Sequence, residues 1–179
     1  MGLTSQMNKT IFIFVEEDSK VLQKKLHEFV LSYYMDLYCV NDNDISIEKE
    51  PGGKPYVSIG NQVARLNFNI SHTSGVGVVA FSECSIEVDI EKIHEPDYRI
   101  VRRFFVESEQ RYILDVESEE IRRNRFFEIW TKKEAYLKWK GRGLAGGLKN
   151  INVLEKRYAY QQIEIGGSRY AMSIYNGII

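Results

Sequence analysis

The sequence lacks several features that assign a chain to a familiar class. Its 179 residues include only two cysteines, Cys39 and Cys84, which lie far apart and form no CxxC pair. We therefore expect no disulfide framework, and we expect the protein to function in a reducing cytoplasm. No apolar run approaches the roughly 18 residues of a membrane span. Because no basic stretch, apolar segment and cleavage site follow one another at the N-terminus, we expect no signal peptide.

An excess of charge of one sign is also missing. The chain has 24 Lys and Arg against 25 Asp and Glu, a formal net charge of −1, so neither nucleic acid nor a membrane surface is an expected partner. No HExxH or CxxH spacing predicts a zinc site, and no Walker A spacing surrounds Lys54. A GxGxxG match at residues 141–146 follows a helix, whereas the dinucleotide fingerprint leads from a strand into a helix.

What the sequence does contain is a stretch, Ile86–Glu91, in which apolar and acidic residues alternate strictly. Alternation predicts a half-buried strand with Glu87, Asp89 and Glu91 on one face. Same-face neighbours on a strand lie roughly 6–7 Å apart, so these carboxylates repel one another. A hard cation such as Mg²⁺, shared with substrate phosphates, would relieve that repulsion. The alternative is a solvated edge strand that binds nothing.

A second candidate region lies in a long helix predicted over residues 118–140. Glu134 and Lys138 are spaced i, i+4 and share a helix face. One interpretation is an ordinary surface ion pair, worth about 0.3–0.5 kcal/mol. The other is that Glu134 completes a metal site with Asp89 and Glu91, and that Lys138 faces an anion held by the metal.

Ser71 and His72 follow a strand predicted at residues 66–70, and a sharp turn there would let both side chains hold phosphate oxygens. A purely structural histidine is the alternative. A Ser-His nucleophile pair is disfavoured, because adjacent residues rarely bond each other in that way and no GxSxG elbow is present.

The remaining pattern predicts an α+β protein. Helices are expected at 19–38, 97–105, 108–115 and 118–140, with Ser108 as the N-cap of the third. Strands are expected at 10–15, 45–48, 56–59, 66–70, 76–81, 85–90, 152–154, 158–165 and 169–175. The strand at 85–90 is expected to pair with 76–81 through a turn at Glu83 and Cys84. Two α+β halves, 1–84 and 85–179, then form one compact unit with an internal cleft.

Five segments together resemble the 4′-phosphopantetheinyl transferases of the larger, pseudo-dimeric, surfactin-synthetase-activating type. They are GGKP at 52–55, FNISH at 68–72, EVDIE at 87–91, RFFVESE at 103–109 and WTKKEAYLK at 130–138. The resemblance covers roughly residues 50–145. It is specific because (V/I)D(I/V)E is joined with W(T/S)xKExxxK at this spacing.

The resemblance implies a pseudo-dimeric fold of two similar halves with the active site in the cleft between them. The implied reaction moves the phosphopantetheine arm of coenzyme A onto a serine of an acyl or peptidyl carrier protein and releases adenosine 3′,5′-bisphosphate. Mg²⁺ bound by Asp89, Glu91 and Glu134 would grip the pyrophosphate. Glu134, directly or through a metal-bound water, would be the base, and Lys138 would stabilise or protonate the leaving group.

Coenzyme A phosphates would be held by Lys54, Ser71, His72 and Lys138, again by resemblance. The chain departs from the family where Glu87 stands in place of a glycine, and its N-terminal region is short, with Lys24 and Lys25 as partial substitutes for basic residues near the adenine.

An acidic carrier protein is expected to dock on the helices at 97–115, and the chain is expected to act as a monomer. The rival hypotheses are a carrier-protein or coenzyme A binding module without turnover, and a Mg²⁺-dependent phosphohydrolase.

Overall fold

The structure, a computed structural model, describes residues 9–141 and 147–177 as a mixed α/β protein, as predicted. Its strands are β1 (Lys9–Val15), β2 (Ile45–Lys49), β3 (Pro55–Ile59), β4 (Gln62–Val63), β5 (Asn67–Thr73), β6 (Val76–Ser82), β7 (Glu87–Lys92), β8 (Ala159–Ile165) and β9 (Ser168–Tyr175). Its helices are α1 (Ser19–Tyr38), α2 (Arg99–Phe104), α3 (Glu107–Leu114) and α4 (Glu119–Trp139), with short 3₁₀ segments η1 (Asp42–Asp44) and η3 (Leu148–Asn150). Most of the GxGxxG match, residues 142–146, lies outside the described ranges.

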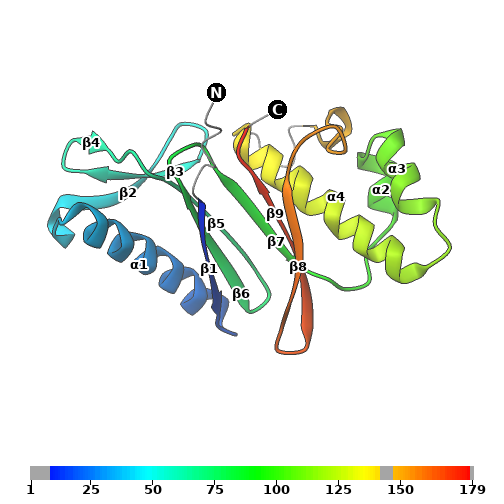
Figure 1. The fold of residues 1–179 in the computed structure, drawn as a ribbon, viewed down its shortest axis with the longest axis horizontal. Coiled ribbons are helices and arrows are strands. Elements are labelled where there is room, and N and C mark those ends of the chain that lie inside the picture. Colours follow the sequence, from blue (N-terminus) through cyan, green and yellow to red (C-terminus); the bar gives the residue numbers. More distant parts are fainter. Residues whose placement is uncertain (1–8, 142–146, 178–179) are drawn as a thin grey trace, which may run out of the picture.

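The described strands form three antiparallel sheets of three strands each, in the orders β1-β6-β5, β2-β3-β4 and β7-β9-β8. The first and third sheets share one strand arrangement: the strand that comes first in the chain lies at an edge, and the strand that comes last lies in the middle. Each also has a long helix, α1 or α4, between its first strand and its closing hairpin. Figure 1 shows these two helices on opposite sides of the central strands.

Helix α1 packs its apolar face on the first sheet. Its N-terminus is capped by Asp18, whose side chain accepts hydrogen bonds from two backbone N–H groups of the first turn. Gly77 on β6 permits the close packing, because a Cβ at that position would lie 2.6 Å from Leu26 Cδ1. The residues of α1 with no exposed surface recur at i+4: Leu22, Leu26, Val30 and Tyr34.

A buried apolar cluster joins the first and third sheets. It contains Val78 and Ala80 of β6, and Val88 and Ile90 of β7. Because side chains alternate on a strand, the acidic residues of β7 lie on its other face, toward α4. The prediction that the acidic and apolar residues of this stretch separate onto two faces is therefore confirmed.

Strand β7 nevertheless differs from the prediction in pairing and burial. It pairs with β9, whereas β6 lies between β1 and β5, so the predicted hairpin with residues 76–81 is wrong. The connection through Glu83 and Cys84 carries the chain from one sheet to another instead. Glu87 and Asp89 are only 1% and 4% exposed, so the strand is not half-buried, and the solvated-strand alternative is also wrong.

Strand β5 is longer than predicted, which changes the placement of Ser71 and His72. Both residues lie within the strand, and the turn comes later, at Ser74 and Gly75. The predicted sharp turn at Ser71 is therefore wrong. The reason is that polar side chains in a strand are stable where a second element covers them with hydrogen-bonding groups, which the sequence of the strand does not reveal.

Glu109 accounts for two further corrections. Its side chain accepts hydrogen bonds from the backbone N–H groups of Val106 and Val153, at 3.1 and 2.9 Å. Helix α3 consequently begins at Glu107 after Val106, so Ser108 is not its N-cap. Residues 152–154 do not form the predicted strand, because the backbone there bonds to a side chain of α3.

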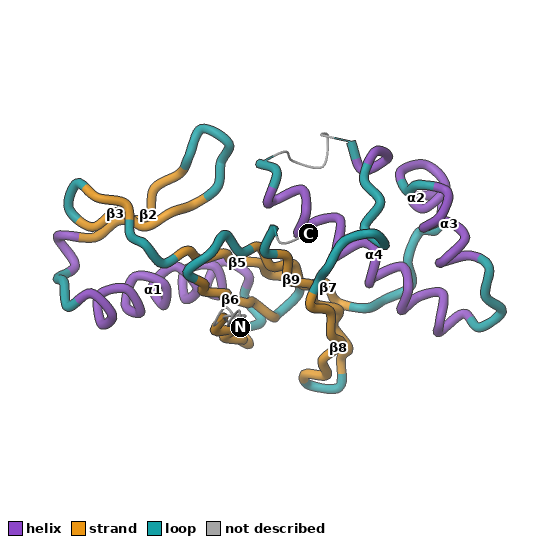
Figure 2. Tube along the Cα trace, turned by 45° about the horizontal axis from the view of Figure 1, so that its top comes forward, coloured by secondary structure: helices purple, strands orange, loops and turns teal. Residues whose placement is uncertain are grey.

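The small second sheet lies beside α1 (Figure 2), and its Ile45 and Val57 belong to the same buried cluster as Leu26 of that helix. The turn of its β2–β3 hairpin approaches the end of α4, since a Cβ built on Gly52 would lie 3.8 Å from the backbone oxygen of Gly141. Among the described helices, none combines the length and hydropathy that crossing a membrane requires.

Candidate active site

Two edge strands from different sheets, β5 and β7, meet through their side chains. Three polar residues of β5 each donate a hydrogen bond to the carboxylate that lies 18 residues further along the chain. The constant offset means that the two strands run in the same direction. The pairs are Asn69 with Glu87, Ser71 with Asp89 at 3.1 Å, and Thr73 with Glu91 at 3.0 Å.

The same side chains cap the backbone of β7. The N–H of Val88 donates to Asn69 Oδ1 at 3.0 Å, and the N–H of Ile90 donates to Ser71 Oγ at 3.3 Å. The free edge of a strand exposes unpaired backbone donors, and here side chains satisfy them in place of another strand. The acidic face of β7 is thereby fixed against β5.

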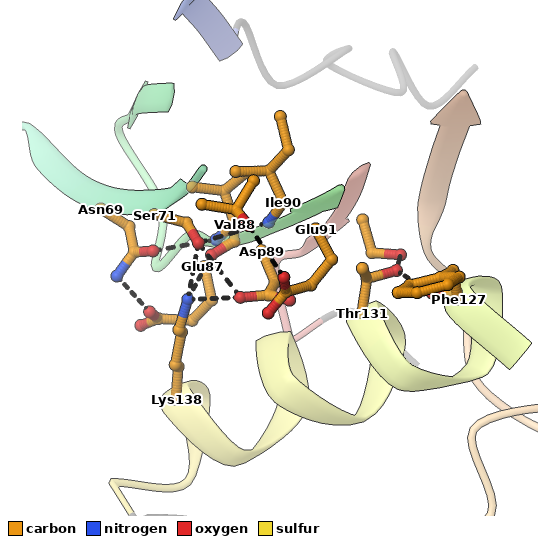
Figure 3. Close-up of polar contacts among 12 residues, drawn as sticks. Asn69, Ser71, Glu87, Val88, Asp89, Ile90, Glu91, Phe127, Thr131 and Lys138 are labelled. Carbon is orange, nitrogen blue, oxygen red and sulfur yellow. Dashed lines mark hydrogen bonds and ion pairs between the residues drawn. The ribbon is translucent and has the colours of Figure 1, made fainter. Parts of the chain in front are cut away.

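Helix α4 supplies a cation to this seam, as Figure 3 shows. Lys138 Nζ donates to Asp89 Oδ1 at 2.7 Å, to Ser71 Oγ at 3.1 Å and to the backbone oxygen of Val88 at 3.0 Å. The Lys138 side chain is 32% exposed, while that of Asp89 is 6% exposed. Charge-assisted bonds in partly buried surroundings are stronger than exposed ion pairs, so the ordinary surface pair with Glu134 does not describe this lysine.

Glu134 lies one turn before Lys138 on the same side of α4. Its Oε1 atom is buried, and within the described residues it has no hydrogen-bond partner. Burial, and then the charge of Asp89, raise the pKa of Glu134 from its ordinary value of 4.5 to about 7, although Lys138 acts in the opposite direction. Burial and Asp89 also raise the pKa of Glu91.

The carboxylates meet the chemical requirements of a hard cation only in part. Asp89 Oδ2 and Glu134 Oε1 are both buried acceptors without a hydrogen-bond partner in the described chain, and such atoms are free to bind a cation. Over the same residues, however, no three His, Cys, Asp or Glu side chains are placed so that they could hold a metal together. Mg²⁺ commonly takes one or two carboxylates, with waters and substrate phosphates as its other ligands, so the residues fit a two-carboxylate site.

A cavity of about 290 Å³ opens beside these carboxylates. It lies between the β2–β3 turn on one side and the last turns of α4 on the other. The charged residues in its lining are Lys54, Glu87, Glu134 and Lys138. The site thus joins residues from the first 84 positions with residues from the remainder of the chain.

Residues 85–176 match the family model described as the 4′-phosphopantetheinyl transferase superfamily. This match covers a little more than half of the 179 residues and includes β7, with its acids, and α4. The chain belongs to this superfamily.

Its relatives in the superfamily include the 4′-phosphopantetheinyl transferase gsp of Aneurinibacillus migulanus, 34% identical over 116 residues, which are 64% of this chain and 46% of that protein. The transferase psf-1 of Bacillus pumilus is 33% identical over 65% of this chain and 48% of its own length. Sfp of Bacillus subtilis strain 168 is 29% identical over 73% of this chain and 57% of its own length. The chain spans about half the length of these curated relatives.

Within this superfamily member, the predicted site residues fall into three groups. Asp89, Glu134, Lys138 and Ser71 converge at the seam, with Glu91 beside them through its bond to Thr73. Lys54 reaches the cavity from the β2–β3 turn. His72 is separated from them, since alternation along β5 turns it to the face opposite Ser71, where it is exposed.

The sequence analysis did not identify Asn69 and Thr73 as site residues. In the structure they donate hydrogen bonds to Glu87 and Glu91 and so hold β5 against β7. A signal for them exists in the alternation of Asn69, Ser71 and Thr73, which has the same period as the three acids of β7. Matching two polar strand faces across 18 residues would have placed β5 against β7.

Proposed function

We propose that the chain transfers the 4′-phosphopantetheine group from coenzyme A to a serine of an acyl or peptidyl carrier protein. The observation that carries this proposal is that Glu134 and Lys138 line one cavity, and that Lys138 also bonds to Asp89, in a member of the transferase superfamily. We further propose that the two larger sheets are the two halves of a pseudo-dimeric fold, with the reaction in the cleft between them. The shared strand order of these sheets supports that description.

In the proposed reaction, Glu134 accepts the proton of the carrier serine. The place of Glu134 in the cavity lining, one turn from Lys138, supports this role as a general base acting directly or through a water. The serine oxygen forms a bond to the phosphorus attached to pantetheine, and the bond from that phosphorus to the bridging oxygen breaks. Adenosine 3′,5′-bisphosphate departs with the negative charge, which Lys138 stabilises or protonates.

We assign a divalent cation, Mg²⁺ in our proposal, to Asp89 and Glu134, with Glu91 beside them. When bound, such an ion acts as a Lewis acid on the pyrophosphate and neutralises charge as the bond breaks. Ser71 and Thr73 orient Asp89 and Glu91 through the hydrogen bonds of the seam. Because Lys138 occupies only one oxygen of Asp89, the other remains available.

Coenzyme A would extend from this seam into the cavity, where Lys54 and Lys138 supply cationic groups. His72 is exposed and does not line the cavity, so a phosphate that it holds would lie outside the cavity. The carrier protein would dock on α2 and α3, where Arg102 and Arg103 lie in the last turn of α2. We propose a monomer, because both halves of the cleft come from one chain, and a reducing cytoplasm, where two exposed free thiols are stable.

The proposal is tested by intact-protein mass spectrometry of an apo carrier protein after incubation with this protein, coenzyme A and Mg²⁺. A gain of about 340 Da, the mass of one arm, that is lost with EDTA is expected, because chelation removes the charge neutralisation at the pyrophosphate. Coenzyme A binding without any gain on several carriers would instead identify a binding module. Release of phosphopantetheine without a carrier would identify a phosphohydrolase.

A further inference from the structure

Lys54, one of the two lysines in the described lining of the cavity, forms an ion pair within the protein. Its Nζ lies 2.6 Å from Glu87 Oε1 and donates to Ser85 Oγ at 3.0 Å. The side chain of Lys54 is 20% exposed, whereas that of Glu87 is 1% exposed. The pair therefore links the β2–β3 turn to β7. It also neutralises the charge of Lys54 within the protein.

Glu87 is held in place from its other side as well. Its second oxygen accepts a hydrogen bond from Asn69, whose own oxygen accepts from the backbone of Val88. Glu87 Oε2 is thus held by the amide of Asn69, and Oε1 by the ion pair with Lys54, although Oε1 accepts no hydrogen bond within the described residues. Glu87 lines the cavity together with Lys54, so it faces whatever enters there.

The consequence for an anionic ligand follows from the charges in the cavity wall. Among the lining residues that the structure describes, each lysine already has a carboxylate partner: Lys54 has Glu87, and Lys138 has Asp89. A phosphate that approaches Lys54 must share it with Glu87 or displace it. A like charge fixed beside a binding site disfavours a ligand by repulsion and by competition for the same cation.

We propose that Glu87 is a specificity-determining residue that weakens the binding of phosphate groups at Lys54 and so sets the affinity for coenzyme A. This inference rests on the proposed function for the identity of the ligand. Glu87 acts on binding and not on the phosphoryl transfer itself, because it contacts Lys54 and Asn69 and leaves Asp89 and Lys138 paired with each other.

The test is isothermal titration of wild type, Glu87→Gln and Glu87→Gly with coenzyme A, with adenosine 3′,5′-bisphosphate and with pantetheine, in EDTA. Both variants should bind the two phosphorylated ligands about tenfold more tightly, a conservative value for the removal of a like charge beside a bound anion. Pantetheine, which has no phosphate, should show no change. Glu83→Gln is the matched control, because it removes the same charge from the exposed connection before β7.

Transfer kinetics separate this inference from the proposed function. Glu87→Gly should lower the KM for coenzyme A and leave kcat within about twofold of wild type, since binding alone changes. Unchanged or weaker binding of coenzyme A by both variants, with their melting temperatures preserved, would overturn the inference even if the wild type transfers normally. If the variants bind coenzyme A more tightly but neither they nor the wild type transfer the arm, the inference about Glu87 stands and the proposed function is wrong. A large fall in kcat would show that Glu87 belongs to the catalytic group.

Discussion

The first and third sheets carry the same arrangement of strands and helix, but only α4 adds charged groups to the apolar packing between helix and sheet. α1 places Leu22, Leu26 and Val30 against its sheet, and the facing side of β1 carries aromatic rings, with Phe12 4.8 Å from Phe29. α4 faces β7 with Glu134 and Lys138. The first unit is closed by apolar packing, whereas the second combines apolar packing, with Ile129 of α4 and Ala171 of β9 in one buried cluster, with hydrogen bonds between charged groups.

This difference shows what a reaction site requires of a scaffold. Charged groups are costly to bury unless they have partners, and the partners at β7 come from a strand of the other sheet. Without Ser71 of β5, Asp89 would lose a hydrogen-bond donor and Lys138 would lose an acceptor. The first sheet therefore contributes directly to the site, because Ser71 on its edge strand β5 bonds to both Asp89 and Lys138.

The largest expected contrast is between Asp89→Ala and Phe12→Ala, at corresponding edge strands. Asp89→Ala should reduce transfer by at least about a thousandfold, since the proposed cation loses a carboxylate ligand and Lys138 loses its ion-pair partner, and the fold should remain intact. Phe12→Ala should cost about 2 kcal/mol of stability through lost packing and leave kcat nearly unchanged. Carrier mass shifts and thermal melting measure the two effects. Turnover retained by Asp89→Ala would refute the role of this residue.

The second contrast concerns the two cores. Lys133 and Glu109 form an ion pair at 2.7 Å with no exposed side-chain surface, and Lys133 also donates to the backbone oxygens of Leu148 and Ile151. Lys133→Met should destabilise the fold by about 3–5 kcal/mol, because it leaves a buried carboxylate without its counter-ion.

Leu26→Ala in the apolar core is the comparison, with an expected cost of about 2–5 kcal/mol. Urea denaturation measures both. A loss below about 1 kcal/mol for Lys133→Met would contradict the view that this pair holds α3 and the segment after α4 onto the α4 helix.

The smallest contrast is in pH dependence. The pKa of Glu134 lies at about 7 in the folded chain, above its ordinary value of 4.5, so the folded state binds more protons between these values. The free energy of unfolding should therefore fall as the pH rises through this window, and Glu134→Gln should show a smaller fall, because only Glu87 and Glu91, whose pKa values burial also raises, still contribute. Because solvent reaches Glu134 in part, we expect a difference of about 2 kcal/mol between pH 5 and pH 8 in EDTA.

Urea denaturation of both proteins at the two pH values makes the measurement. The buried titratable group of α1, Tyr34, has its pKa raised further above neutrality by burial, so it adds no slope in this range. Parallel pH profiles for wild type and Glu134→Gln would contradict the burial of an ionisable carboxylate on α4.

Local patterns were enough to predict the elements that carry the site. Alternation predicted the acidic face of β7, and helical spacing predicted α1 and α4 to within a residue or two. Those signals depend on neighbours along the chain, through the two-residue period of strands and the 3.6-residue turn of helices. The family resemblance then pointed to Asp89, Glu134 and Lys138, which the structure brings together.

The sequence alone also determined that this is a mixed α/β chain whose acidic strand and long helix belong to the phosphopantetheinyl transferase superfamily. Only the tertiary structure decided that β7 pairs with β9, that Asn69 and Ser71 cap its free edge, and that Glu87 turns to Lys54. Each of these contacts joins residues that are distant in sequence or lie in different sheets. Their energies depend on which groups are buried together, and no local period encodes that choice.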